Sequence, residues 1–231
     1  MPNKLSRLCE LVASIARMPV ARLDFHLAIN PDDVGKMHRH FTRRHPRYVV
    51  FQNKSLGAAL VDLNKFATRD AYLATIKGRN SGEHLARKAK AKGYLVVEID
   101  RNRFIDDIHA INTSVEVRQG RTMDAAYRDK VLHFNHDKNY KYYGVINPAG
   151  KLVAYGDLGL YGNFVAFNRV IGLRNNDGIM HLMVTEIICH MIEAHQVRYV
   201  MYDTCFGASA GLLGFKKMLG FEPYRAKYTL Q

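Results

Sequence analysis

The stretch that decides the fold lies near the end of the chain. It reads Tyr202-Asp203-Thr204-Cys205 and then Gly211-Leu212-Leu213-Gly214-Phe215-Lys216-Lys217-Met218-Leu219-Gly220-Phe221. The first part predicts a strand that ends at Asp203, and the second predicts a helix. That helix stops at Gly220, because glycine readily adopts the left-handed conformation that closes helices. A last strand, 221–230, follows and completes a strand–helix–strand unit.

Upstream of this unit, strands and helices alternate in the pattern of an α/β domain. Apolar periodicity predicts strands at 94–99, 142–146, 152–158, 164–171 and 197–202, and helices at 104–117, 124–134 and 178–195. The last of these helices is apolar around most of its circumference, which predicts burial on both sides. Before residue 94 the pattern predicts helices at 31–44 and 68–92, the latter broken at Gly78 and Gly82, and strands at 48–52 and 58–63.

This element order, together with the spacing Gly-Leu-x-x-Phe-Lys-x-x-x-Gly, resembles GNAT-fold N-acyltransferases, and within them the Fem-type branch, which takes aminoacyl groups from charged tRNA. The resemblance covers about residues 94–230. It implies an α/β (α+β) fold, GNAT-like, with a mixed central sheet and helices on both faces. It also implies a GNAT-like acyltransferase domain at 94–231 behind a basic N-terminal part at 1–93, which is a reduced GNAT-like half or an extension.

The same resemblance implies where the reaction takes place. The central strand 164–171 should part from strand 197–202, so that backbone N–H groups in the gap can meet an acyl carbonyl. We expect Asp203, at the carboxyl end of its strand, to face this crevice. It could accept a proton or fix an amine, or it could only cap the following loop. Lys216 stands where Fem-type members keep a lysine, which implies contact with an oxyanion or a tRNA 3′ end; a surface lysine is the alternative.

The donor loop departs from the CoA pattern. CoA-dependent members carry Gln/Arg-x-x-Gly-x-Gly/Ala before the long helix, where N–H groups hold the pyrophosphate. Here Asp177 and Ile179 replace the glycines, and we expect Asp177 to cap the helix. This departure favours a charged-tRNA donor, while acetyl-CoA or another acyl-CoA stays open as the cofactor. The candidate donor-binding residues are Arg174, Asn175, Asn176, Gly178 and Ile179.

The resemblance implies that the loop between the helices predicted at 104–117 and 124–134 shapes the acceptor pocket. Its arginines and glutamine could recognise a carboxylate, a phosphate or a base edge, or they could form a plain exposed turn. The candidate acceptor-binding residues are Ser114, Arg118, Gln119 and Arg121.

The basic charge of the chain is concentrated in its first part. The net charge is +13, and residues 1–93 hold 18 Lys and Arg against 7 Asp and Glu, whereas the remainder holds 16 against 14. Such a stripe attracts polyanions. We expect it to bind tRNA or another nucleic acid, with an anionic membrane surface or a solvated face as alternatives. The densest candidates are Lys36, Arg39, Arg43, Arg44 and Arg47.

The cysteines, the apolar runs and the histidines indicate where the protein is located and whether it binds a metal. Three cysteines are an odd, sparse set that indicates reduced thiols and a cytoplasmic location. No apolar run has the length of a membrane span. His133 and His136 have no identifiable third ligand, so we predict no metal site.

Three functions remain open at this point. The first is an N-acyltransferase that moves an aminoacyl or acyl group from an activated ester, aminoacyl-tRNA, to an amine acceptor. The second is an acyl-CoA-dependent enzyme that acts on a nucleic acid or a small amine. The third is a non-catalytic nucleic-acid-binding protein on the same scaffold.

Overall fold

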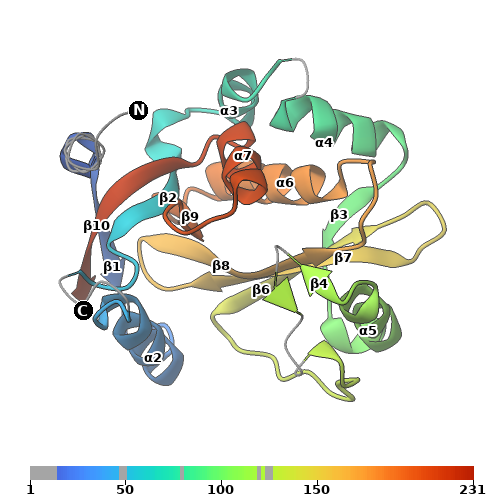
Figure 1. Ribbon diagram of the computed structural model, residues 1–231, viewed down its shortest axis with the longest axis horizontal. Helices are drawn as coiled ribbons and strands as arrows, with labels where there is room; N and C mark the ends of the chain where they lie inside the picture. Colours follow the sequence, from blue (N-terminus) through green and yellow to red (C-terminus); the bar gives the residue numbers. More distant parts are fainter. Residues whose placement is uncertain (1–14, 47–50, 79–80, 119–120, 123–126) are drawn as a thin grey trace, which may run out of the picture.

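A mixed eight-stranded sheet forms the centre of the molecule (Figure 1). The computed structural model describes residues 15–46, 51–78, 81–118, 121–122 and 127–231. The strand order is β1-β10-β2-β9-β8-β7-β6-β3. The strands are β1 (Val20–Phe25), β2 (Leu56–Asp62), β3 (Leu95–Glu98), β6 (Tyr140–Ile146), β7 (Leu152–Leu160), β8 (Phe164–Gly172), β9 (Tyr199–Thr204) and β10 (Glu222–Leu230).

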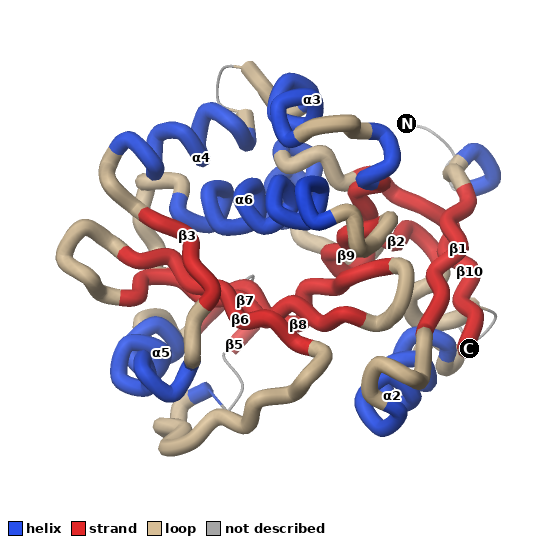
Figure 2. Tube along the Cα trace, turned by 180° about the vertical axis from the view of Figure 1, so that it is seen from behind, coloured by secondary structure: helices blue, strands red, loops and turns tan. Residues whose placement is uncertain are grey.

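Helices cover both faces of this sheet (Figures 1 and 2). One face carries α3 (Arg69–Thr75), α4 (Gly82–Ala91), α6 (Ile179–Ala194) and α7 (Ala210–Met218), and the other carries α2 (Pro31–Thr42) and α5 (Ile105–Thr113). Two short 3-10 helices, η1 (Leu63–Lys65) and η2 (Arg101–Phe104), and a small hairpin, β4 (Val117–Arg118) with β5 (Arg121–Thr122), complete the described elements. The predicted α/β class with a mixed sheet is confirmed.

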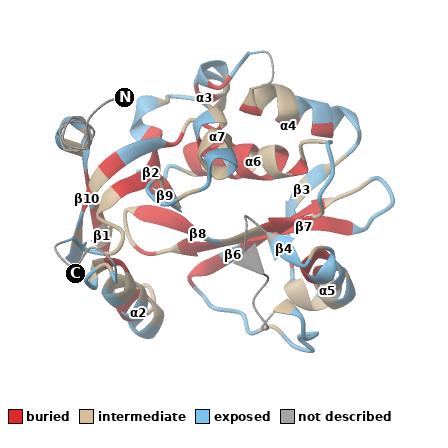
Figure 3. Cartoon of the chain, viewed as in Figure 1, coloured by how far each residue is buried: buried red, intermediate tan, exposed pale blue. Residues whose placement is uncertain are grey.

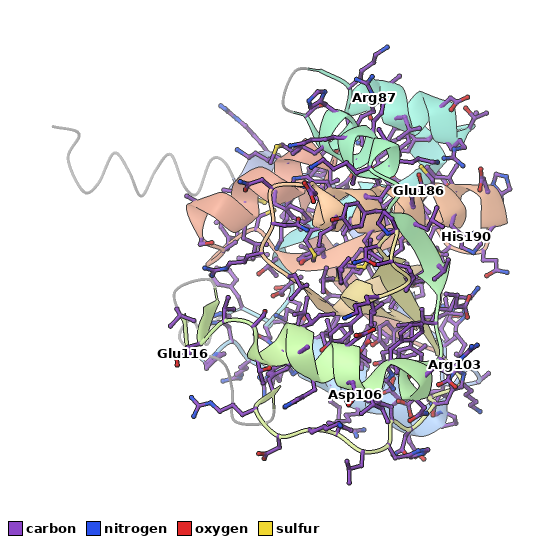
Figure 4. All side chains as sticks on the ribbon, turned by 90° about the vertical axis from the view of Figure 1, so that its right-hand side faces the viewer. Arg87, Arg103, Asp106, Glu116, Glu186 and His190 are labelled. Atoms are coloured by element: carbon purple, nitrogen blue, oxygen red, sulfur yellow. The ribbon has the colours of Figure 1, made fainter. Side chains whose placement is uncertain are left out.

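The long helix α6 is the centre of one hydrophobic core, and Figure 3 shows it almost wholly buried. It packs between the sheet and α4, and the buried residues Leu182, Met183, Ile187 and Ile188 surround its axis. The predicted burial on both sides is confirmed, because within α6 only His190 and Glu193 are exposed. Glu186, which is labelled in Figure 4, lies 3.5 Å from Arg69 of α3 and 3.5 Å from Lys90 of α4.

The second core lies on the other face, under α2 and α5. Asn30 caps α2 by accepting a hydrogen bond from the Asp33 N–H, and Pro31 occupies the first turn, as the sequence predicts. The aromatic rings of Phe25, Phe41 and Phe164 meet edge to face or tilted beneath this helix. This packing fixes α2 against β1 and β10 at one end of the sheet, and His40 and Phe41 near its end line the site described below.

One predicted helix is wrong in the part that the structure describes. We expected a helix over 124–134, but residues 127–134 form no α-helix. The side chain of Asn102 accepts a hydrogen bond from the Phe134 N–H and donates one to its carbonyl. Arg101 also lies over the Phe134 ring at 4.8 Å. These contacts satisfy backbone groups that a helix would use, so tertiary contacts override the local pattern.

Two other boundaries differ from the sequence pattern. The helix predicted over 104–117 ends at Thr113, and β4 begins at Val117. The strand predicted at 48–52 lies partly outside the described residues. The boundary predicted at residue 93 falls between α4 and β3, and β1 and β2 from the basic part belong to the same sheet as β9 and β10.

Candidate functional site

The central feature is an opening between β8 and β9. These strands run parallel and pair at Phe164 with Tyr199, Val165 with Val200 and Ala166 with Met201. Beyond Ala166, the described part of β8 pairs only with β7, where a bulge shifts the register between Asp157 and Leu158. Residues 167–171 of β8 therefore form no ladder pair with β9. This is the parting that the resemblance implies.

Two cavities meet at this opening. The first, about 510 Å³, lies on the α2 face and is called the α2 cavity. The second, about 730 Å³, lies on the α6 face and is called the α6 cavity. Both are lined by Val170, Tyr202 and Leu212, so the cavities adjoin through the gap in the sheet. A ligand on each face could bring reacting atoms together there.

Asp203 lines the α2 cavity from the end of β9. Its φ is 53°, a left-handed conformation that few non-glycine residues adopt, although Asp and Asn tolerate it better than most. Its carboxylate lies 2.5 Å from the Nζ of Lys54, which lines the same cavity. The turn thus presents a charged pair at the mouth of the opening, in agreement with the predicted position of Asp203.

His40, from α2, is a site residue that the sequence pattern did not single out. It lines the α2 cavity, and burial, followed by the positive charges of Arg43 and Lys54, lowers its pKa, while Asp203 acts in the opposite direction. A lowered pKa keeps the imidazole neutral near pH 7, so it can accept a proton. In the sequence His40 was only one histidine inside a basic stripe; its place on a helix face toward the sheet was the available signal.

All five predicted donor-loop residues line the α6 cavity: Arg174, Asn175, Asn176, Gly178 and Ile179. The first turn of α6 therefore faces the cavity. Gly178 has a φ of 84°, and a Cβ there would lie 2.4 Å from the carbonyl oxygen of Leu85. Arg174 donates a hydrogen bond of 2.9 Å to the Val117 carbonyl, so its guanidinium also ties the donor loop to the β4–β5 hairpin.

The predicted capping role of Asp177 is wrong. Gly178 occupies the N-cap position and no side chain caps α6. The carboxylate of Asp177 instead pairs with the Lys92 ammonium and accepts a hydrogen bond of 2.8 Å from the Tyr94 hydroxyl. These two contacts lower the pKa of Asp177. Because its charge is neutralised by α4 and the residues that follow it, Asp177 does not present a free anion to the helix terminus.

His181 faces the α6 cavity from the first turn of α6. Its Nε2 is buried and has no hydrogen-bond partner among the described residues, and its ring lies 4.7 Å from that of Phe215. Burial lowers the pKa of His181 to about 4. Sequence reasoning missed this residue, although a histidine three positions after the donor-loop glycine was visible.

Lys216 is fully buried, so the expected alternative of a surface lysine is wrong. Its Nζ donates a hydrogen bond of 2.7 Å to the Thr204 carbonyl and lies 5.1 Å from the centre of the Tyr202 ring. Burial lowers its pKa. The ammonium supports the loop after β9 from behind and is not among the groups that line either cavity. A direct role in the reaction stays a prediction.

The structure gives less on the predicted acceptor loop. The Ser114 hydroxyl donates a hydrogen bond of 2.7 Å to the Ile111 carbonyl at the end of α5. Arg118 and Arg121 are cross-strand partners in the β4–β5 hairpin. Gln119 lies outside the described residues. Their contact with an acceptor stays a prediction, whereas the α2 cavity contains Arg169 and Tyr127, which the sequence did not indicate.

The predicted nucleic-acid residues lie on and just after α2. Lys36, Arg39, Arg43 and Arg44 are exposed, and Arg47 lies outside the described residues. None of the four forms an ion pair with a described carboxylate. Two cations of α4 differ, because Arg87 pairs with Glu83 at 3.2 Å and Lys90 pairs with Glu186. The α2 side therefore carries a group of neighbouring cations without a carboxylate partner among the described residues.

The described chain offers no metal site or membrane crossing. No cluster of three or more possible metal ligands occurs among the described residues. Within the same residues, none of the helices combines the length and the hydrophobicity that crossing a bilayer requires.

Comparison with known proteins gives matches in structure. No family model and no curated protein sequence matches the chain. The crystal structure of FemX matches with a TM-score of 0.55 and 12% identity, over 73% of this chain and 59% of that one. A conserved protein of unknown function from Bacteroides thetaiotaomicron matches with a TM-score of 0.50 and 15% identity, over 74% and 59%. L-PGS from Bacillus licheniformis matches with a TM-score of 0.44 and 15% identity, over 67% of this chain and 48% of that one.

These matches define the class of fold. The chain has a GNAT-like fold, and the structures that share it include FemX, the Fem-type relative that the sequence resemblance implies. The chain spans about half to three-fifths of the length of these three solved structures. At these identities the likeness concerns the fold, and the activity has to be argued from the site.

Proposed function

We propose that the protein is an N-acyltransferase. The observation that carries the proposal is the opening between β8 and β9, where the α2 and α6 cavities adjoin. An activated acyl group held in the α6 cavity would place its carbonyl in the gap. An amine held in the α2 cavity would approach that carbonyl from the other face.

The chain's own groups suit each part of this reaction. The amine nitrogen bonds to the carbonyl carbon, and the bond from that carbon to the leaving oxygen breaks. Backbone N–H groups of β8 beyond Ala166, where β8 no longer pairs with β9, stabilise the oxygen that becomes negative. Asp203 holds the amine, and neutral His40 accepts the proton that the nitrogen loses. The leaving oxygen takes up a proton, so that charge and protons balance.

The donor that we propose is an aminoacyl-tRNA. The unpaired cations Lys36, Arg39, Arg43 and Arg44 support a nucleic-acid partner, as does the fold shared with FemX. A charged tRNA is found where translation takes place, so a cytoplasmic location belongs to this proposal. Lys216 then acts by holding the loop after β9 in position, through its bond to Thr204.

A second candidate donor is an acyl-CoA. It is favoured by the α6 N-terminus, where Gly178 allows close backbone approach and the Asp177 charge is neutralised. In that case the cations beside the α2 cavity could hold a nucleic-acid acceptor. In the first candidate the cations beside the α2 cavity hold the donor, and in the second they hold the acceptor.

A labelled-donor experiment separates the candidates. The protein is incubated with a mixture of amines and either radiolabelled aminoacyl-tRNA or radiolabelled acetyl-CoA, and label in amide products is measured. We expect transfer from aminoacyl-tRNA, and loss of transfer in Asp203→Asn but not in Asp106→Asn, an exposed aspartate paired with Lys130. Transfer only from acetyl-CoA would support the second candidate. Tight nucleic-acid binding with no transfer from either donor would show a non-catalytic protein.

A further inference from the structure

Arg169 is a cation of the α2 cavity that is only partly neutralised by the protein. It lies on β8 directly opposite Asp157 on β7, and its Nε is 3.8 Å from the Asp157 Oδ2. Its guanidinium also lies 5.2 Å from the centre of the Tyr127 ring. About a third of its side chain remains exposed, and it is one of the groups that line the cavity. The guanidinium is therefore held in place with one part facing the cavity.

Two arginines share the carboxylate that holds Arg169. The Nη1 of Arg101 lies 3.6 Å from the same Oδ2, and the Arg101 side chain is almost entirely buried. Arg101 is fixed by a hydrogen bond of 2.6 Å to the Asn135 carbonyl and by the Tyr142 ring, 3.7 Å away. Asp157 is buried, and the exposed Asp137 acts on it from further out. Asp137 is not among the charges that act on Arg169, which shares the carboxylate of Asp157 with Arg101. The charge of Arg169 is therefore only partly neutralised at this wall, and Arg169 is the cation that reaches the cavity.

The opposite wall has a different character. There Lys54 already forms an ion pair with Asp203, and His40 is neutral near pH 7. Lys54 contacts only the Oδ1 of Asp203, so the Oδ2 can accept a hydrogen bond from an amine at the β8–β9 opening, while a partly neutralised guanidinium lies on the β8 wall. Its volume of about 510 Å³ is within the range of sites for small molecules.

From this arrangement we propose that the α2 cavity binds a small amine that carries an anionic group, a carboxylate or a phosphate, and that Arg169 binds that group. The inference rests on the proposed transfer function, because it names the class of acceptor. A guanidinium is suited to both anions, since its planar donors match two oxygens at once. Asp157, on the neighbouring strand β7, is the positioning residue that orients Arg169. The anion fixes one end of the acceptor while the amine end lies beside Asp203.

Equilibrium binding tests this inference without any donor. Calorimetric titration of the full chain uses matched pairs of amines: the common α-amino acids with their α-amides, and O-phosphoethanolamine with ethanolamine. We expect at least one anionic member to bind and its neutral partner to bind at least about tenfold more weakly, the factor lost with one charge-assisted contact. Whether the acids or the phosphate bind identifies the anion.

Variants keep the test specific. Arg169→Gln should lower the affinity for the anionic amine at least about tenfold, to that of the neutral partner. Arg22→Gln, an exposed arginine on β1, should not. Arg169→Gln leaves the buried Asp157 with one partner fewer, which could destabilise the fold. The double variant Arg169→Gln/Asp157→Asn removes that charge as well. It should remain folded and show the same loss of affinity for the anionic amine.

Several outcomes would overturn the inference. They are equal binding of acids and amides, unchanged binding by both Arg169 variants, no binding of any small amine, or Arg169-dependent binding of a short oligonucleotide alone. The proposed function fails separately: anionic amines that bind through Arg169 without any acyl transfer would leave this site in place and refute the transferase.

Discussion

Asp203 combines an unusual backbone conformation with a charge at the reaction site. Its left-handed φ is accessible to asparagine at little cost, so Asp203→Asn should keep the turn and remove only the negative charge. We expect the transfer rate to fall about 100-fold, the typical contribution of a positioned acid or base, with an unchanged melting temperature. Rates under single-turnover conditions measure this, with Asp106→Asn as the control. An undiminished rate would remove Asp203 from the mechanism.

His181 should make stability depend on pH. Its pKa is lowered from 6.5 to about 4 in the folded protein. Between these values the unfolded chain binds a proton that the folded chain does not, so the contribution is complete above pH 6.5 and is lost as the pH falls toward 4. His181→Phe keeps the ring contact with Phe215 and removes the titrating group. As the pH falls from 6.5 toward 4, we expect its free energy of unfolding to decrease by about 1–2 kcal/mol less than that of the wild type.

The control for this prediction is on the same helix. His190→Phe, which replaces an exposed histidine of α6 by phenylalanine as well, is measured beside it as the matched control. Urea denaturation at a series of pH values measures both variants. Parallel curves for His181→Phe and the wild type would contradict the assignment of the titration to His181.

Individual residues show how far sequence reasoning reaches. The position of Asp203 could be predicted, because strand ends in such sheets point toward a crevice. The burial of Lys216 could not, since its partner is a backbone carbonyl twelve residues away that the sequence pattern does not mark. The same holds for Asp177, whose partners Lys92 and Tyr94 lie across the fold. Short-range rules favour a cap there, and a long-range ion pair outweighs it.

At the scale of elements, the donor loop depends on one glycine. Gly178→Ala would place a methyl group 2.4 Å from the Leu85 carbonyl oxygen at a φ of 84°. We expect a loss of about 3 kcal/mol in unfolding free energy, together with displacement of the loop from α4. Gly214→Ala is the matched control in α7, because its Cβ would meet nothing within 4 Å and alanine favours a helix. Denaturant titration compares them; equal stability of the two variants would contradict the clash.

Elements with strong periodicity could be predicted from sequence, and elements held by distant contacts could not. The apolar positions of α6 and the capping signals of α2 are local, so their existence followed from the chain itself. Residues 127–134 are different, because Asn102 and Arg101 fix that segment from η2. The site has the same limit: His40, Lys54, Arg169 and Asp203 come from four separate parts of the chain, and only the fold brings them to one cavity.

For the molecule as a whole, the arrangement of charge makes a prediction about nucleic-acid binding. Lys36, Arg39, Arg43 and Arg44 form no ion pair with a described carboxylate, whereas Arg87 and Lys90 of α4 do. Each lost phosphate contact should reduce the slope of log K against log salt by about 0.7–0.9. Arg43→Gln/Arg44→Gln should therefore reduce the slope for tRNA by about 1.5, and Arg87→Gln/Lys90→Gln should reduce it much less. Filter binding at several salt concentrations measures this; equal slopes for the two double variants would place the contact elsewhere.

The position of β10 has a consequence for how the chain is assembled in a cell. This strand lies between β1, which it joins in parallel, and β2, which it joins antiparallel. On a translating ribosome, β1 and β2 therefore cannot be joined through β10 until about 160 further residues have been synthesised after the end of β2 (Asp62 to Glu222). A nascent chain halted before Glu222 would leave the facing edges of both strands open to chaperones or to wrong partners, so this part of the sheet should close only once β10 has emerged.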